Sequence, residues 1–171
     1  FNPAAIAEYR LIGYETRALA REDFNNDAVD AGEIGAGHSV TALYEVTPVG
    51  SPAVLNDPLR YGAASGEHKV EAGTADELGF LKLRYKEPGE ARSSLISTPI
   101  PADIQATSTE QAFAVAMAGF GQLLKGSTYL GDWSVDEAIS LASGALGEDT
   151  WGYRGEAVSL MRLYEALDEM K

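Results

Sequence analysis

Apolar and polar side chains alternate along the first part of the chain. The clearest run is a set of alternating apolar and basic residues: Leu81, Lys82, Leu83, Arg84, Tyr85 and Lys86. A period of two predicts a strand with one apolar face and one basic face. Because lysines on the open face of a strand discourage further pairing, we expect this strand at the edge of a sheet.

Other segments of this part also have strand patterns. Asn2 and Pro3 predict a short helical turn that leads into a strand at residues 9–15. Alternation at residues 40–46 predicts a strand with one buried face. A further strand is expected at residues 94–98. Pro99 and Pro101, which follow it, should end the strand.

Two long connections separate these strands. Residues 18–38 are rich in Asp, Asn and Gly and show little periodicity, which predicts a polar loop. Residues 49–76 are rich in Gly, Ala, Ser and Pro and predict a long hairpin connection between the flanking strands, with a mobile tip at residues 63–73.

After residue 101 the apolar spacing becomes helical. Ser108 with Gln111, and Ser134 with Glu137, have the spacing of capping boxes, and a third helix should begin near Tyr153. The residues expected on the buried stripes of these helices are Phe113, Met117, Phe120, Leu124, Ile139, Leu141, Ala142, Leu146, Val158, Met161, Leu163, Tyr164 and Leu167.

Strands followed by helices predict an α+β fold. We expect a mostly antiparallel sheet or half-sandwich in residues 1–100, packed with about three helices in residues 101–171. With 171 residues, 45% of them hydrophobic, the chain can build one substantial core shared by both parts, or two small cores.

Composition excludes several kinds of site. The chain has no cysteine and two histidines, so disulfides, thiolate metal sites and cysteine nucleophiles are absent. Its net charge of −13 repels phosphate backbones and anionic lipid, which argues against nucleic acid and membrane surfaces as partners. No apolar run is long enough for direct membrane insertion.

The polar loop carries a candidate calcium site. Its oxygen-bearing side chains are Asp23, Asn25, Asp27, Asp30 and Glu33. Oxygen ligands of this type are those that calcium prefers. The loop departs from an EF-hand, because Ala28 stands at the glycine position and Ile34 at the position of the bidentate glutamate. The alternative is a solvated turn in which these side chains cap local backbone groups.

A hydrolytic site is a further alternative. A carboxylate of Glu33 or Asp30 could orient the imidazole of His38 as a general base. No serine lies in a nucleophile elbow, and a histidine that hydrogen-bonds the loop is the simpler interpretation. The second histidine, His68, falls in the connection expected to be mobile.

Six aromatic residues could form a platform for a carbohydrate or a peptide: Tyr9, Tyr14, Tyr44, Trp133, Trp151 and Tyr153. Their spacing is more typical of packing in the core and between elements. We therefore expect them to be packing residues.

Several short blocks of the sequence occur together in one known family. They are Phe1-Asn2-Pro3, YRLIGYE at 9–15, Glu22-Asp23-Phe24, DAGEIGAGH at 30–38, VTALYE at 40–45, FGQLL at 120–124, Gly147-Glu148-Asp149 and Gly152-Tyr153-Arg154. In these blocks the chain resembles the YfbK-type C-terminal domain of bacterial von Willebrand factor A proteins. That domain is one of unknown function, so the resemblance supplies no catalytic residues.

The resemblance also implies a context. Such domains follow a von Willebrand factor A domain, so we expect a missing N-terminal portion of the protein to contain one, and the parent proteins are often exported or lipid-anchored. A location in the cell envelope or periplasm follows from the resemblance only.

Together these observations predict a non-catalytic scaffold and interaction module, without catalytic residues or organic cofactor. Its expected partners are the upstream von Willebrand factor A domain of the same chain and a further, unidentified protein. Such a module should expose apolar surface where its neighbour docks. Binding of calcium through residues 23–33 and hydrolysis around His38 are the alternatives.

Overall fold

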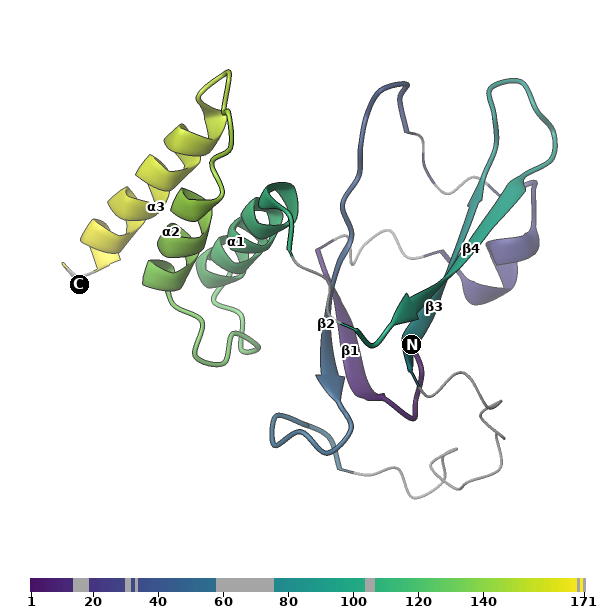
Figure 1. Ribbon diagram of the computed structural model, residues 1–171, viewed down its shortest axis with the longest axis horizontal. Coiled ribbons are helices and arrows are strands. Elements are labelled where there is room, and N and C mark those ends of the chain that lie inside the picture. Colours follow the sequence, from purple (N-terminus) through teal and green to yellow (C-terminus); the bar gives the residue numbers. More distant parts are fainter. Residues whose placement is uncertain are drawn as a thin grey trace. The chain divides into compact units, whose positions relative to one another are not determined.

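The chain folds as an α+β protein, as predicted. Its computed structural model describes residues 1–13, 19–29, 32, 34–57, 76–103, 107–168 and 170. The chain divides into two compact units, Phe1–Ile104 with the strands and Gln105–Lys171 with the helices (Figure 1). Within the described part, none of the helices combines the length and apolar content needed to cross a bilayer.

The first unit contains two separate antiparallel ribbons. Strand β1 (Ile6–Ile12) pairs with β2 (Leu43–Pro48), and β3 (Glu77–Tyr85) pairs with β4 (Ser94–Pro101). The predicted long hairpin between β2 and β3 is therefore wrong, because each of these strands takes another partner. Periodicity identified the strands but carries no information about their pairing.

Several details differ from the predictions, beginning with β1, which starts at Ile6 and not at residue 9. Strand β2 begins at Leu43, and Val40 is an exposed residue outside it. The predicted loop contains a 3-10 helix, Arg21–Asn25. Strand β4 continues through Pro99 and Pro101, since in a two-stranded ribbon the missing N–H group can lie on the free outer edge. The predicted mobile tip and His68 lie outside the described residues.

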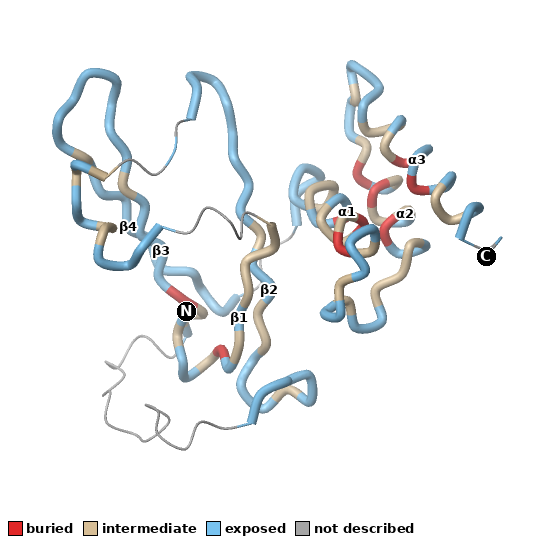
Figure 2. The backbone as a smooth tube through the Cα atoms, turned by 180° about the vertical axis from the view of Figure 1, so that it is seen from behind, coloured by how far each residue is buried: buried red, intermediate tan, exposed pale blue. Residues whose placement is uncertain are grey.

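The first unit buries little apolar surface. Among its described residues, Ile6 is the only hydrophobic side chain in the buried class, and Figure 2 shows most of both ribbons as exposed or intermediate. The predicted buried face of the second strand is therefore wrong, because Tyr44 is 50% exposed. A single two-stranded ribbon is at best marginally stable in water, so these ribbons gain by further burial.

The second unit consists of α1 (Thr109–Leu124), α2 (Val135–Gly144) and α3 (Tyr153–Asp168). Both predicted capping boxes are confirmed. The Ser108 hydroxyl accepts the backbone N–H of Gln111 at 3.2 Å, and the Gln111 side chain accepts the backbone N–H of Ser108 at 3.0 Å. Ser134 and Glu137 repeat this reciprocal arrangement at the start of α2.

Helix α2 packs against both α1 and α3. The buried cluster at their contacts contains Ala116, Phe120, Ala138, Ala142, Val158 and Met161. Three of these are fully buried alanines, which let the helices approach closely. Placing Leu163 and Leu167 on the buried stripe of α3 was wrong, since both are exposed. Met117 and Leu124 of α1 are likewise exposed, because the buried face of α1 is turned toward Ala116.

The aromatic residues divide into two groups. Trp133 packs against the helical core, as expected, whereas Trp151 and Tyr153 are exposed and contradict the packing interpretation. Tyr14 lies outside the described residues.

Arg154 joins the three helices. Its guanidinium donates hydrogen bonds to the carbonyl oxygens of Ala145, at 3.1 Å, and Leu146, which follow α2. It also pairs with Glu110 and lies 4.9 Å from the ring centre of Phe113, both of α1. A cation at a helix C-terminus satisfies otherwise unpaired carbonyls, so this one side chain ties α3 to both of its neighbours.

Asp149 organises the start of α3. Its carboxylate accepts the backbone N–H groups of Arg154, at 3.0 Å, and Gly155, at 2.8 Å. Hydrogen bonding favours the charged form, so these contacts, that from Gly155 first, hold the pKa of Asp149 below its usual value.

Asp149→Asn should therefore have a pH-dependent effect. Because the folded-state pKa is lowered, the carboxylate stabilises the fold fully above its unfolded-state pKa of about 3.9, and this stabilisation is lost as the pH falls through the folded pKa. The difference in urea midpoint between wild type and variant should be largest at neutral pH and shrink below about pH 4. Glu148→Gln, which removes a charge from the exposed neighbour, is the control; equal differences at both pH values would contradict the assignment.

Candidate functional site

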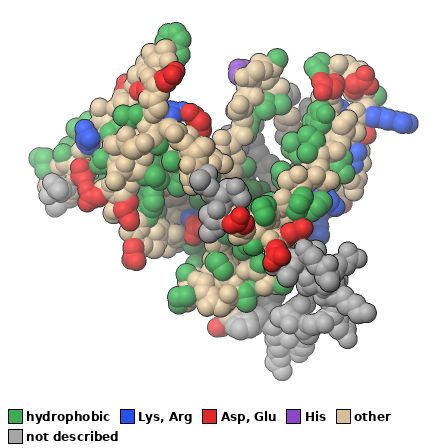
Figure 3. Space-filling view, viewed as in Figure 1, with side chains coloured by type: hydrophobic (Ala, Val, Ile, Leu, Met, Phe, Trp, Pro, Cys, Tyr) green, Lys and Arg blue, Asp and Glu red, His purple; other side chains and the backbone are tan. Residues whose placement is uncertain are grey.

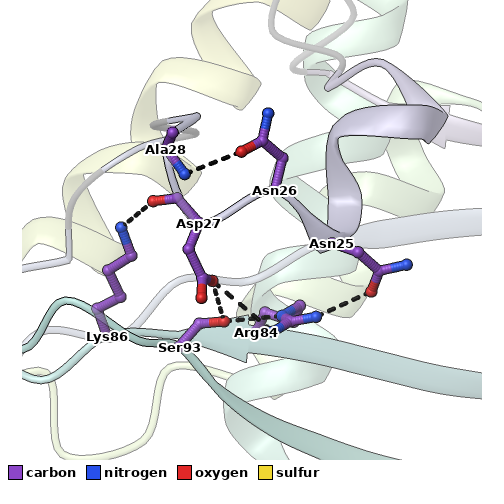
Figure 4. Close-up of polar contacts among 7 residues, drawn as sticks. All are labelled: Asn25, Asn26, Asp27, Ala28, Arg84, Lys86 and Ser93. Carbon is purple, nitrogen blue, oxygen red and sulfur yellow. Dashed lines mark hydrogen bonds and ion pairs between the residues drawn. The ribbon is translucent and has the colours of Figure 1, made fainter.

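The predicted calcium loop is fastened to the β3–β4 ribbon. Figure 4 shows that Asn25 and Asp27 face side chains from the end of that ribbon. Arg84 donates a hydrogen bond to the side-chain oxygen of Asn25 at 2.8 Å, and its guanidinium lies 3.7 Å from the Asp27 carboxylate. Ser93 donates its hydroxyl to the same carboxylate at 2.5 Å, and Lys86 donates to the Asp27 carbonyl oxygen.

These contacts determine the electrostatics of the loop. The hydrogen bond from Ser93 is the main reason that the pKa of Asp27 lies below its usual value, and the positive charges of Arg84 and Lys86 act in the same direction. Asp27 is therefore a carboxylate whose charge is already balanced by two cations. A calcium ion bound here would have to compete with the Arg84 guanidinium.

The full predicted ligand set is not brought together in the described structure. Asp23 belongs to the 3-10 helix, where its backbone oxygen accepts the N–H of Asn26 at 3.0 Å. Asp30 and Glu33 lie outside the described residues. Among the residues that are described, no group of three or more histidine or acidic side chains could hold a metal. The calcium site stays a prediction.

His38 closes a short turn in the glycine-rich segment. Its backbone N–H donates to the carbonyl oxygen of Gly35 at 3.0 Å, and its ring lies so close to Gly35 that a Cβ there would be 2.4 Å from Nδ1. The carboxylates proposed to orient its imidazole, Asp30 and Glu33, lie outside the described residues. The hydrolytic site therefore also stays a prediction.

The two faces of the β3–β4 ribbon differ in chemistry. Residues directly opposite in an antiparallel pair lie on the same face. Leu83 is opposite Ile96, and Arg84 is opposite Leu95. One face, the β3–β4 apolar face, therefore carries Leu81, Leu83, Tyr85, Ile96 and Ile100. All five of these side chains are exposed, by 36% to 51%, and hydrophobic side chains are visible over this ribbon in Figure 3.

The loop is attached from the opposite face of this ribbon. Lys82 and Arg84 alternate with the apolar residues, and Arg84 is one of the side chains that hold Asn25 and Asp27. Lys82 and Arg84 therefore lie on the face opposite Leu81, Leu83 and Tyr85, as predicted. That face is not purely basic, because it also carries Phe80 and Leu95, each 53% exposed. Because the loop is bound through this face, the β3–β4 apolar face is left open.

The β1–β2 ribbon repeats this division. Tyr9 is opposite Val46, and Leu11 is opposite Tyr44; these four residues make the β1–β2 apolar face. The other face carries the ion pair of Arg10 with Glu45, at 2.5 Å, and Glu8.

Glu8 holds the connection that follows β2. Its carboxylate accepts the backbone N–H groups of Leu55, at 3.0 Å, and Asn56, at 2.8 Å, and the Asn56 side-chain amide at 2.7 Å. These hydrogen bonds, that from Leu55 first, lower the pKa of Glu8. In this ribbon, too, a connection occupies the polar face.

Phe1 touches both apolar faces. Its ring centre lies 4.7 Å from that of Tyr9 and 5.5 Å from that of Tyr44. Its Cα lies only 3.3 Å from the position that a Cβ on Gly79 would occupy, beside Ile100. Asn2 fixes this arrangement by donating its backbone N–H to Leu78, at 2.9 Å, and its side-chain amide to Glu77, at 2.8 Å.

Sequence reasoning did not identify this junction. Alternation revealed that the ribbons are two-faced, but the apolar faces were expected to be buried. One signal was available, because a glycine inside a strand often marks the close approach of another backbone. Gly79, in β3, is such a glycine.

Comparisons with known proteins support the resemblance found in the sequence. The family described as "Uncharacterized protein YfbK, C-terminal" matches residues 1–167. "Uncharacterized protein YfbK" of Escherichia coli (strain K12) is 42% identical over 170 residues, a match that covers 99% of this chain and 29% of that protein. The chain thus spans less than a third of this relative's length. No solved structure matches it significantly.

Proposed function

Since the chain belongs to the family of YfbK C-terminal domains, we propose that it is a non-catalytic interaction module that packs against a neighbouring domain of the same protein. The single observation that carries this proposal is the open β3–β4 apolar face. A contiguous exposed apolar surface of this kind is typical of a protein interaction site.

The energetics of the first unit support the proposal. Two ribbons with one buried hydrophobic side chain among their described residues gain little from their own packing. Burying a fully exposed leucine or isoleucine contributes about 1.5–3 kcal/mol, and covering these side chains, which are at most about half exposed, contributes about half of that each. A neighbour docked on this face would therefore stabilise the unit as well as bind it.

The proposed partner is the region that precedes this domain in the full-length protein. The relative is longer than the matched region, and the matching family is described as C-terminal, and both observations support the proposal that further chain precedes this domain. Following the resemblance in the sequence, we propose a von Willebrand factor A domain there. In this proposal the neighbour binds the external ligand and the module supports it.

The test is binding of the chain to the separately produced preceding region. Leu83→Ser removes a half-exposed side chain of the β3–β4 apolar face and should weaken binding about 3- to 10-fold, the equivalent of covering the exposed half of one leucine. Lys82→Ser is the matched control, because it changes an exposed residue of the same strand on the opposite face. Equal binding by the two variants, or no binding by the wild type, would reject the proposal.

A further inference from the structure

Phe1 and Asn2 lie against different parts of β3. Asn2 pairs with the backbone of β3, because its N–H group donates to the carbonyl oxygen of Leu78 at 2.9 Å. Phe1 instead has its Cα on the side of Gly79 from which a side chain would project, 3.3 Å from the Cβ position. The backbone at Phe1 therefore lies over the face of the ribbon. That face is the apolar one, because Gly79 is opposite Ile100.

Gly79 is the residue of β3 against which the Phe1 backbone lies. It is buried, and a side chain there would meet the Cα and ring of Phe1 and the Cδ1 of Ile100, at 3.3–3.7 Å. A glycine inside a strand is costly, so its presence is accounted for by the close approach it permits. The two hydrogen bonds from Asn2 to β3 then hold Phe1 in place.

From this geometry we infer that the stretch of chain immediately before Phe1 in the full-length protein lies across the β3–β4 apolar face and covers it in cis. The inference rests on the proposed function and names the part of the neighbouring region that makes the contact. Gly79 to Tyr85 extends about 20 Å along β3, at about 3.3 Å per residue, so about six extended residues would cover it.

The chemistry of the face defines its occupant. Leu81, Leu83 and Ile96 offer aliphatic surface. Tyr9 and Tyr44, which contact the Phe1 ring, add further apolar surface. The preceding stretch should therefore present apolar side chains toward β3. Coverage in cis is also favoured at equilibrium, because a tethered segment acts at a high effective concentration.

The experiment is a cysteine scan in the full-length protein, made possible by the absence of cysteine from this domain. Each of the ten or so residues before Phe1 is changed to cysteine in turn, with other cysteines of the protein replaced, and combined with Leu83→Cys. Lys82→Cys is the matched control on the opposite face. Both positions are exposed, so neither change should impair folding.

The expected result after oxidation is an intramolecular disulfide with Leu83→Cys that is lost with Lys82→Cys. No cross-link with Leu83→Cys above the Lys82→Cys level would overturn the inference. A cross-link between two protein molecules only would also overturn it and identify a second copy as the occupant. If the cross-link fails while Leu83→Ser still weakens binding of the preceding region, the interaction module stands and only the identity of the covering segment is wrong.

Discussion

Replacing Met161 with alanine should lower the free energy of unfolding of the helical unit by about 2–5 kcal/mol, the usual cost of such a deletion in a core. Met161 of α3 is fully buried, at 0% exposure, in a cluster with Val158 and Ala142. The small alanines of α1 and α2 cannot extend into the space left behind, so a cavity would remain. Urea unfolding followed by circular dichroism measures the loss.

Met170→Ala is the matched control. It deletes the same side chain at a position that is 81% exposed, and should change the free energy of unfolding by less than about 0.5 kcal/mol. Losses of similar size for the two variants would contradict the assignment of Met161 to the core.

Gly119→Ala should destabilise the helical unit, although the same change elsewhere in α1 should stabilise it. Alanine is favoured over glycine in a helix by about 1 kcal/mol. At Gly119, however, a Cβ would lie 2.4 Å from the indole atoms Nε1 and Cε2 of Trp133. Overpacking of this kind costs about 1–3 kcal/mol, and a contact as short as this one lies toward the upper end, so the cost exceeds the gain in helix propensity.

Gly121 provides the comparison within the same helix. A Cβ at this position meets nothing within 4 Å, so Gly121→Ala should give the full gain of about 1 kcal/mol. The two variants should therefore move the urea midpoint in opposite directions. A rise for both would show that Trp133 does not pack against Gly119.

The helices could be predicted well because their signals are local. A capping box needs only the N-cap residue and the one three positions later, so Ser108 and Ser134 identify helix starts without knowledge of the rest of the fold. The buried faces were less predictable. Alanines such as Ala138 are weakly hydrophobic, yet they lie at the helix contacts because they are small, and the larger Leu163 and Leu167 are left outside.

The strands were predictable as strands, but their partners were not. Which ribbon a strand joins depends on contacts between residues far apart in the sequence. The alternation of apolar and polar residues does not predict these contacts. The same reason explains the candidate sites. Nothing near Asp27 in the sequence indicates that Arg84 and Ser93 would hold it, since these residues follow 57 and 66 positions later. The open apolar faces could not be foreseen, because alternation predicts two-faced strands whether or not anything covers them.

The anchoring of Asn2 on β3 has a consequence for how the protein folds during synthesis. The side-chain hydrogen bond from Asn2 to Glu77 joins residues 75 positions apart. At about 5–20 residues per second, the ribosome needs roughly 4–15 s to make the chain between them. During that interval Phe1 and Asn2 cannot make their contacts with β3, and β1 can pair only with β2. Each helix packs on the next one along the chain, so the time between the synthesis of a helix and that of its partner is much shorter. The β unit should therefore be the slower and more aggregation-exposed part of the nascent chain.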